Sequence, residues 1–385
     1  MREEASEIKI KINKTDNFLE SIGVKYFQRI SNRFKSESSI KFDNIPSDSV
    51  LNIVSNNIMI SSVVIAFLVG ALTTIPAVLF QYFYSERFDT FYYYLILSLL
   101  TTVFLLIEVG VLYWISMRSI HTLAYLVGFK ENDSSIPTQY DVKKIMVRSA
   151  LELEDPVIEY LGIDPHKYVS KKWLLIRTIL YKAKIVLSTL LLRVVLQKLA
   201  LRFGLRMSFL WLTIPVTAIW DAIVMFRVIQ DAKLRLFGYH LSRYIAEEII
   251  TDRFMDNCSP DMQEGAIRAI STVVILSKNY HPNSITLLLR LGKNLEVNEA
   301  KDYDDLEKFL EYLETTTPQE KHLLRTLSAM SAVFDGKINR GEKKALKRIF
   351  ANEKRYMDFA KELKELLVKG SIHQSAHLCE EMLLK

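Results

Sequence analysis

Three ionisable residues lie inside apolar stretches of this sequence. Glu108 is the only charged residue in positions 90–117, and Asp221 is the only one in positions 207–226. Arg193 lies in another apolar stretch, upstream of Asp221. Ionisable side chains at membrane depth usually face a bundle interior and pair with one another, and they often mark ion or proton pathways. The set therefore predicts either a charge relay or, in the interpretation we favour, a buried polar link between helices.

A segment closer to the C-terminal end carries oxygen ligands of the kind that Ca²⁺ prefers. Asp335, Asn339 and Glu342 lie close together around Gly336. A twelve-residue EF-hand loop starting at the aspartate would end on an acid, but Leu346 occupies that position. The same residues fit a turn in which Gly336 ends one helix in the left-handed conformation and Asn339 with Glu342 caps the next. We therefore expect a turn, with metal binding as the lesser alternative.

A histidine pair provides a second set of metal-ligating residue types. His373 and His377 are four positions apart, so on a helix they share a face, and this spacing can bind zinc. Cys379 would point away from this face. Two isolated histidines with this spacing usually lie on the solvent-exposed surface of a helix. Phosphate-binding glycine loops, nucleophile elbows, zinc-protease motifs and paired cysteines do not occur in the sequence. We predict no catalytic residue and no cofactor, with a metal-dependent membrane enzyme as a distant alternative.

The elements that would position Glu108 are long enough to cross a bilayer. Between Asp48 and Glu86 there is no charged residue, and a hydrocarbon core of about 30 Å needs about 20 apolar residues in a helix. We predict a transmembrane hairpin in residues 51–118, with spans at about 58–84 and 91–117. Tyrosines at the turn predict an aromatic belt at one membrane interface, formed by Tyr82, Tyr84, Tyr92, Tyr93 and Tyr94.

A second membrane-associated hairpin is expected in residues 173–236, with apolar stretches at about 185–201 and 207–226. Five basic residues would share a sector about 80° wide on its first helix, namely Arg177, Lys184, Lys198, Arg202 and Arg206. A basic stripe on an apolar helix suits a helix that lies against anionic lipids of the inner leaflet. A spanning hairpin remains the other interpretation, in which Arg193 pairs with Glu108 or Asp221. The sequence leaves two or four spans open.

The flanking segments are polar and helical. Residues 1–50 contain an amphipathic helix and a linker, residues 119–172 form a mainly helical segment, and residues 237–385 form a helical domain. Within this domain, Thr317, Pro318 and Glu320 predict a capping box at a helix start. Basic residues flank the first hairpin, whereas its turn has one base against two acids, so both chain termini are expected in the cytoplasm.

Several short motifs, in order, resemble an uncharacterised bacterial membrane-protein family. They are Ala150–Pro156 (ALELEDP), Gly162–Pro165 (GIDP), Tyr181–Lys184 (YKAK) and Ile214–Asp221 (IPVTAIWD). The stretch from Pro215 to Ala232 is also faintly similar to EcsC-type proteins, where Asp221 replaces a usual Asn. This resemblance implies a class of membrane protein and no established activity.

The segment Phe334–Glu342 (FDGKINRGE) resembles TerB-like helical domains, which would extend over about residues 317–369. In that family an Asp-Gly turn and a following Glu join two helices, and the domain is linked with tellurite resistance and membrane-associated stress responses. The resemblance implies a stress-related role. Several acids expected near the turn are missing here.

The sequence as a whole predicts an all-α protein, with transmembrane helical hairpins and a cytoplasmic helical domain. We expect a non-catalytic interaction or stress-response protein, anchored in the bacterial inner membrane. Its expected partners are anionic lipids and an unidentified cytoplasmic protein, and nucleic acid is not among them because the basic stripe lacks interleaved aromatic residues. The alternative is a small transporter or channel component that uses Glu108, Arg193 and Asp221 as a charge relay.

Overall fold

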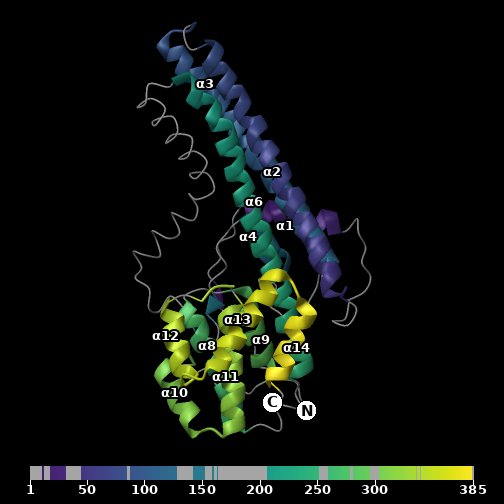
Figure 1. Ribbon diagram of the computed structural model, residues 1–385, viewed down its shortest axis with the longest axis vertical. Coiled ribbons are helices and arrows are strands. Elements are labelled where there is room, and N and C mark those ends of the chain that lie inside the picture. Colours follow the sequence, from purple (N-terminus) through teal and green to yellow (C-terminus); the bar gives the residue numbers. More distant parts are fainter. Residues whose placement is uncertain are drawn as a thin grey trace.

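The protein is an all-α molecule in which a long helical bundle projects from a helical domain (Figure 1). The computed structural model describes residues 11–12, 18–31, 45–84, 87–127, 142–151, 158–159, 163, 206–250, 259–277, 281–294, 303–334, 336–338 and 340–383. Within these residues, extended pairing occurs between β1 (Lys11–Ile12) and β2 (Ile158–Glu159), which are antiparallel. The predicted fold class is confirmed.

Three helices form the bundle: α2 (Asp48–Tyr84), α3 (Thr90–Leu126) and α6 (Arg206–Tyr244). All three are long and apolar enough to cross a membrane, and α2 and α3 cover the two spans predicted for the first hairpin. The rings of Tyr82 and Trp211 lie 6.0 Å apart at the tip. Because Trp211 is near the start of α6 and Tyr82 near the end of α2, α6 runs antiparallel to α2 and parallel to α3.

Small side chains let the bundle helices pack closely. The buried residues of α2 along this contact are Leu51, Ser55, Ser62, Ala66, Gly70, Thr73, Thr74 and Val78. Small and hydroxyl residues are typical of helix interfaces in membranes, because they allow the backbones to approach and to form hydrogen bonds between helices. By contrast, large apolar side chains such as Leu72, Leu99 and Leu106 are exposed on the outside of the bundle. The bundle thus has a polar interior seam and an apolar exterior.

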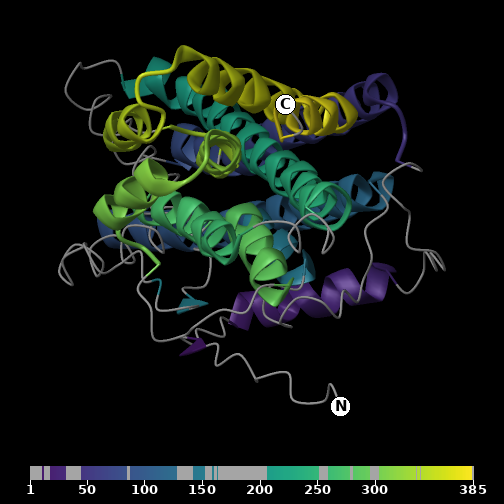
Figure 2. The same cartoon turned by 90° about the horizontal axis from the view of Figure 1, so that it is seen from below.

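The N-terminal amphipathic helix packs against protein. Helix α1 (Phe18–Ser31) contacts the domain end of α3 and helix α4 (Val142–Ala150). Glu20 and Arg148 form a buried two-point ion pair with both N–O distances at 2.8 Å. Figure 2 shows α1 on the opposite side of the molecule from α13 and α14. The amphipathic face of α1 is therefore used to pack on the rest of the protein.

The domain is built around the second half of α6. A π-helical turn, η2 (Ile245–Ile249), follows α6 directly. The other helices are α8 (Pro260–Ser277), α9 (Pro282–Asn294), α10 (Leu306–Thr315), α11 (Pro318–Val333), α12 (Arg340–Ile349), α13 (Lys354–Lys369) and α14 (Ile372–Leu383). Every residue from Ala232 to Ser242 is buried, so α6 is surrounded on all sides there. The predicted domain boundary at residues 236 and 237 falls inside this continuous helix.

Local sequence signals place the helix ends of the domain. Thr317 and Glu320 form the predicted capping box, with Pro318 at the first helical position. Gly336 adopts the left-handed conformation expected of it, with φ of 69°. Gly370 does the same between α13 and α14, with φ of 88°. A Cβ atom at Gly370 would also lie 2.3 Å from Cε2 of Phe237, so glycine is needed there for both conformation and space.

Candidate functional site

The first candidate site lies in the interior of the bundle, where Glu108 of α3 faces α2. Its carboxylate is 1% exposed and accepts a hydrogen bond of 2.6 Å from Oγ1 of Thr73. Glu108 lies ten positions before Arg118, a rise of about 15 Å along a helix, so it is near mid-depth of a membrane. Below it, the hydroxyl oxygens of Ser62 and Ser119 lie 2.7 Å apart. These contacts join α2 and α3 through polar atoms.

Asp221 of α6 reaches the same turn of α2 from the other side. It is 2% exposed, and a Cβ atom added at Gly70 would lie only 2.4 Å from its Oδ2. The absence of a side chain at Gly70 therefore makes the space that the carboxylate occupies. Since Gly70 and Thr73 are separated by less than one helical turn, the structure brings Glu108 and Asp221 to one level of the bundle. Arg193, the third member of the predicted set, lies outside the described residues.

This arrangement can do two things chemically. A buried carboxyl group can hold a proton, because the ionised form is costly in a membrane interior and is retained mainly where it has polar partners. The same groups also fix the angle and register of the helices, because each can be satisfied only in the packed bundle. Both properties depend on α2, because Thr73 donates a hydrogen bond to Glu108 and Gly70 leaves space for Asp221.

A second set of contacts joins the base of the bundle to the end of the chain. Oδ1 and Oδ2 of Asp48 accept hydrogen bonds of 2.9 Å from the backbone amides of His373 and Gln374. Asp48, which starts α2, thereby caps the N-terminus of α14, where free amides and the helix dipole favour a negative charge. Nε2 of His373 also lies 3.2 Å from the carbonyl oxygens of Ile45 and Pro46. The contacts form a clamp between α2 and α14.

The predicted metal-ligating residues are placed apart by this packing. His373 is engaged in the clamp, whereas His377 is exposed. Cys379 is buried and its thiol has a raised pKa because of burial. Glu342 is buried at the start of α12, while Asp335 and Asn339 lie outside the described residues. In the part of the chain that the structure describes, no group of three or more His, Cys, Asp or Glu residues is placed to hold a metal ion.

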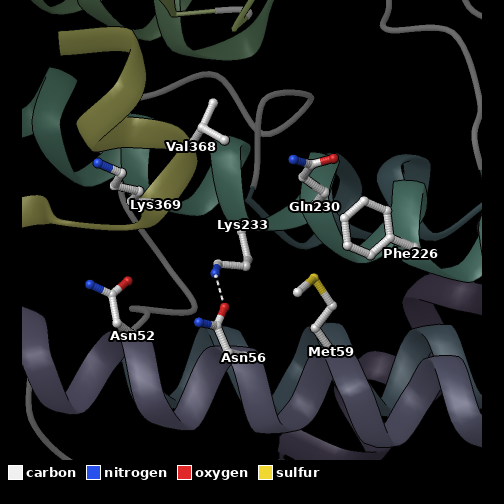
Figure 3. A pocket seen from close by; sticks show the side chains of 8 residues that line it. All are labelled: Asn52, Asn56, Met59, Phe226, Gln230, Lys233, Val368 and Lys369. Atoms are coloured by element: carbon white, nitrogen blue, oxygen red, sulfur yellow. Dashed lines mark hydrogen bonds between the residues drawn. The ribbon is translucent and has the colours of Figure 1, made fainter. Parts of the chain in front are cut away.

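A pocket of about 380 Å³ lies where the bundle meets the domain (Figure 3). Helices α2, α6 and α13 form its walls. The lining residues are Asn52, Asn56, Met59, Phe226, Gln230, Lys233, Val368 and Lys369. The polar groups of the lining are amides and ammonium groups, and none of the lining side chains is acidic. The pocket lies beside Phe226, at the end of the stretch of α6 predicted to span the membrane.

Lys233 is the most buried charged group of this pocket. The residue is 4% exposed, and its ammonium group donates a hydrogen bond of 3.1 Å to Oδ1 of Asn56. The ammonium also lies 6.0 Å from the ring centre of Phe237. Among the described residues, no carboxylate forms an ion pair with it. Buried charges are normally paired, so a buried lysine beside an open pocket indicates a site for an anion.

The domain core contains two histidines, His240 and His281, that are held neutral because burial lowers their pKa. Burial lowers the pKa of His281 to about 3, and the nearby Arg235 guanidinium adds to this effect. Neither ring nitrogen of His281 has a hydrogen-bond partner. His281 precedes α9, and its carbonyl accepts hydrogen bonds from the amides of Ser284 and Ile285. The imidazole therefore fills space in the core, and its protonation would oppose folding.

Sequence reasoning identified Glu108 and Asp221 but missed the pocket. A signal for it in the sequence was the pair of asparagines Asn52 and Asn56, which lie four positions apart and therefore on one face of α2. Lys233 follows an apolar stretch, where a lysine usually extends to the interface, so the sequence carries no signal of its burial. Most of the predicted basic stripe, including Arg177, Lys184, Lys198 and Arg202, lies outside the described residues, as does the side chain of Arg206.

The fold and these sites together define an all-α protein with three potential membrane helices fused to a helical domain. Comparison of the chain with protein-family models, with curated proteins and with solved structures found no match. The resemblances to an uncharacterised membrane-protein family, to EcsC-type proteins and to TerB-like domains therefore stay predictions.

Proposed function

We propose that this chain is a multi-pass protein of the bacterial inner membrane whose helical domain acts on the cytoplasmic side as a non-catalytic interaction module, in a stress response. The observation that carries the proposal is the continuity of α6 from the apolar bundle into the centre of the domain. Because one uninterrupted helix belongs to both parts, the domain is held in a fixed position at the membrane surface. The clamp between Asp48 and α14 supports the same fixed position.

The distribution of charge supports the cytoplasmic orientation of the domain. Basic residues occur at the domain end of the bundle, among them Arg118, Arg227 and Lys233. At the tip, the turn has Arg87 beside Asp89. Lys and Arg in short segments next to spans favour the cytoplasmic side, so this distribution supports a tip on the outer side.

The packing of α6 also supports four crossings over two. Ser149 of α4 donates a hydrogen bond of 2.9 Å to Asp231, so Ser149 lies at the domain end of α6. Trp211 lies at the tip beside Tyr82. The chain must therefore pass from one end of the bundle to the other between Ser149 and Trp211. If α2, α3 and α6 each cross the membrane, this passage is a further crossing.

Cysteine labelling in intact cells tests this arrangement. In a cysteine-free background, Arg87→Cys at the tip and Gly204→Cys just before α6 should react with a membrane-impermeant reagent from outside. Lys343→Cys, on the exposed face of α12, should react only after the membrane is opened. Labelling of Lys343→Cys from outside would contradict the orientation, and protection of Gly204→Cys in intact cells would contradict four crossings.

The interaction role is proposed for the exposed basic face of α12. Arg340, Lys343, Lys344 and Lys347 are exposed, while Leu346 and its apolar neighbours are buried. Such a face suits a partner with an acidic surface, because complementary charge favours association and orientation. A photo-cross-linking residue at Lys343 or Lys347 should give a discrete product in cells, whereas the same residue at Gln28 on α1 should not. The absence of a product from both α12 positions would contradict this role.

A second candidate function is an ion- or proton-coupled transporter or channel component, and the meeting of Glu108 and Asp221 at one turn of α2 favours it. A relay needs titratable groups at membrane depth that lie close together. Flux in proteoliposomes should then be abolished by Glu108→Gln, which keeps the size and polarity of the side chain. Equal flux through the unmodified protein and Glu108→Gln would exclude the relay and leave Glu108 as a link between helices.

A further inference from the structure

We propose that the pocket between α2, α6 and α13 binds the phosphate group of an anionic phospholipid from the cytoplasmic leaflet, with Lys233 as its principal ligand. This proposal rests on the proposed membrane orientation, which places the domain on the cytoplasmic side. It adds a specific ligand site to a protein for which only general lipid contact was expected. The site is built from residues far apart in the sequence, and Figure 3 shows how they face a common space.

The charge of Lys233 is the first argument. Transfer of an ammonium group into a protein interior is costly unless it is paired. Among the residues that the structure describes, the partners of this ammonium are the Asn56 amide oxygen and the face of Phe237. An ammonium group has three N–H donors, and Asn56 accepts one of them. The remaining donors are available for an anion in the pocket. Lys369 of α13 also lines the pocket and adds a second positive charge.

The amides of the pocket are the second argument. Asn56 accepts from Lys233 through its oxygen, which leaves its NH₂ group to donate, and Gln230 supplies another amide. Oδ1 of Asn52 is buried and has no hydrogen-bond partner among the described residues, while its Nδ2 lies 3.4 Å from Oγ of Ser371. Rotation of this amide by half a turn would present its NH₂ group to the pocket and let its oxygen accept from the Ser371 hydroxyl. An anion with several oxygens, such as phosphate, matches this set of donors.

The position of the pocket is the third argument, and it favours a lipid over a free anion. Met59 and Phe226 form the wall on the side of the bundle. Beside them, Ile60 and Ile223 are exposed on the apolar exterior, where an acyl chain would lie. A phosphate in the pocket would thus be at headgroup level, with its hydrocarbon against the bundle. A choline headgroup would bring its own cation next to Lys233 and Lys369, so an anionic headgroup is preferred.

The test compares lipid and phosphate binding to the purified full-length protein. Heat unfolding is followed in a neutral detergent with added phosphatidylglycerol, phosphatidylcholine or inorganic phosphate. A ligand that binds only the folded state raises the unfolding temperature as its concentration rises. Of the three ligands, phosphatidylglycerol should raise the unfolding temperature most. Inorganic phosphate at the same concentration should have little effect on it.

Two variants and one control identify the site. Lys233→Met should weaken phosphatidylglycerol binding by about tenfold or more, since it removes charge-assisted hydrogen bonds. Asn56→Asp keeps the lysine but supplies a carboxylate as its partner, so it should weaken binding in the same way even if Lys233→Met folds poorly. Lys308→Met removes an exposed positive charge on α10, outside the pocket and outside the basic face of α12, and should bind as the unmodified protein does.

The outcomes separate this proposal from the proposed function. An equal effect of inorganic phosphate would overturn the assignment to a lipid and indicate a soluble anion. Unchanged lipid binding by Lys233→Met and Asn56→Asp would overturn the site itself. Either result leaves the anchored orientation standing if Arg87→Cys and Lys343→Cys still label from opposite sides, because that measurement does not depend on the pocket.

Discussion

The clamp between α2 and α14 gives the most direct test of how the bundle and the domain are joined. In Asp48→Ala, both hydrogen bonds to the amides of His373 and Gln374 are lost. Replacing an N-capping aspartate by alanine costs about 0.5–2 kcal/mol. Since each carboxylate oxygen accepts an amide and the charge complements the helix dipole, we expect a loss near the upper end, about 2 kcal/mol.

The loss of stability in Asp48→Ala should affect α14 itself as well as the global free energy of unfolding. Amide hydrogen exchange of α14 should speed up in Asp48→Ala, because the first turn of the helix is no longer held. Asp48→Asn retains an oxygen that accepts one amide and should lose about half as much, and the exposed neighbour Ser49→Ala is the control. If Asp48→Ala and Ser49→Ala have the same unfolding free energy and the same exchange in α14, the reasoning is wrong.

Three other perturbations follow from contacts described above. Gly70→Ala would place Cβ 2.4 Å from Oδ2 of Asp221, so it should destabilise the bundle by about 1–3 kcal/mol; a double-mutant cycle with Asp221→Ala should recover much of this loss, and strict additivity would count against the clash. Arg148→Met leaves the carboxylate of Glu20 buried without its two-point partner and should cost about 3–5 kcal/mol by chemical unfolding. With a pKa of about 3 when folded, His281 stays neutral while the unfolded chain takes up a proton below about pH 6.5. Stability is therefore retained above that pH and lost below it, by about 3 kcal/mol at pH 4.5, and His281→Leu should reduce the pH dependence of unfolding.

The parts of the fold that were predictable depend on local sequence. The hairpin of α2 and α3 followed from the length of uncharged sequence, and the start of α11 followed from Thr317 and Glu320, because span length and caps involve residues close together in the chain. The level of Glu108 within its helix was predictable for the same reason. In each case a single segment contains all the information that decides the structure.

The parts that were not predictable depend on which segments meet. Lys233, Asn56 and Lys369 lie in three helices, and none of these helices identifies its neighbours by its own sequence. Likewise, the carboxylate of Asp48 caps α14 as a result of tertiary packing, which the sequence around Asp48 does not indicate. Lys233 follows an apolar stretch as flanking lysines do, and only the packing of α13 over it turns it into a buried charge.

The clamp between Asp48 and α14 has a consequence for the order in which the molecule is assembled. Its two partners are separated by 325 positions in the chain, so α2 is made long before the helix that it caps. At the usual speed of synthesis, the intervening residues take about half a minute. During that time the base of α2 and one side of α6 lack the cover that α14 later provides. Completion of the domain thus waits for α14 to leave the ribosome, and a chain that lacks α14 would keep an exposed surface that proteases can recognise.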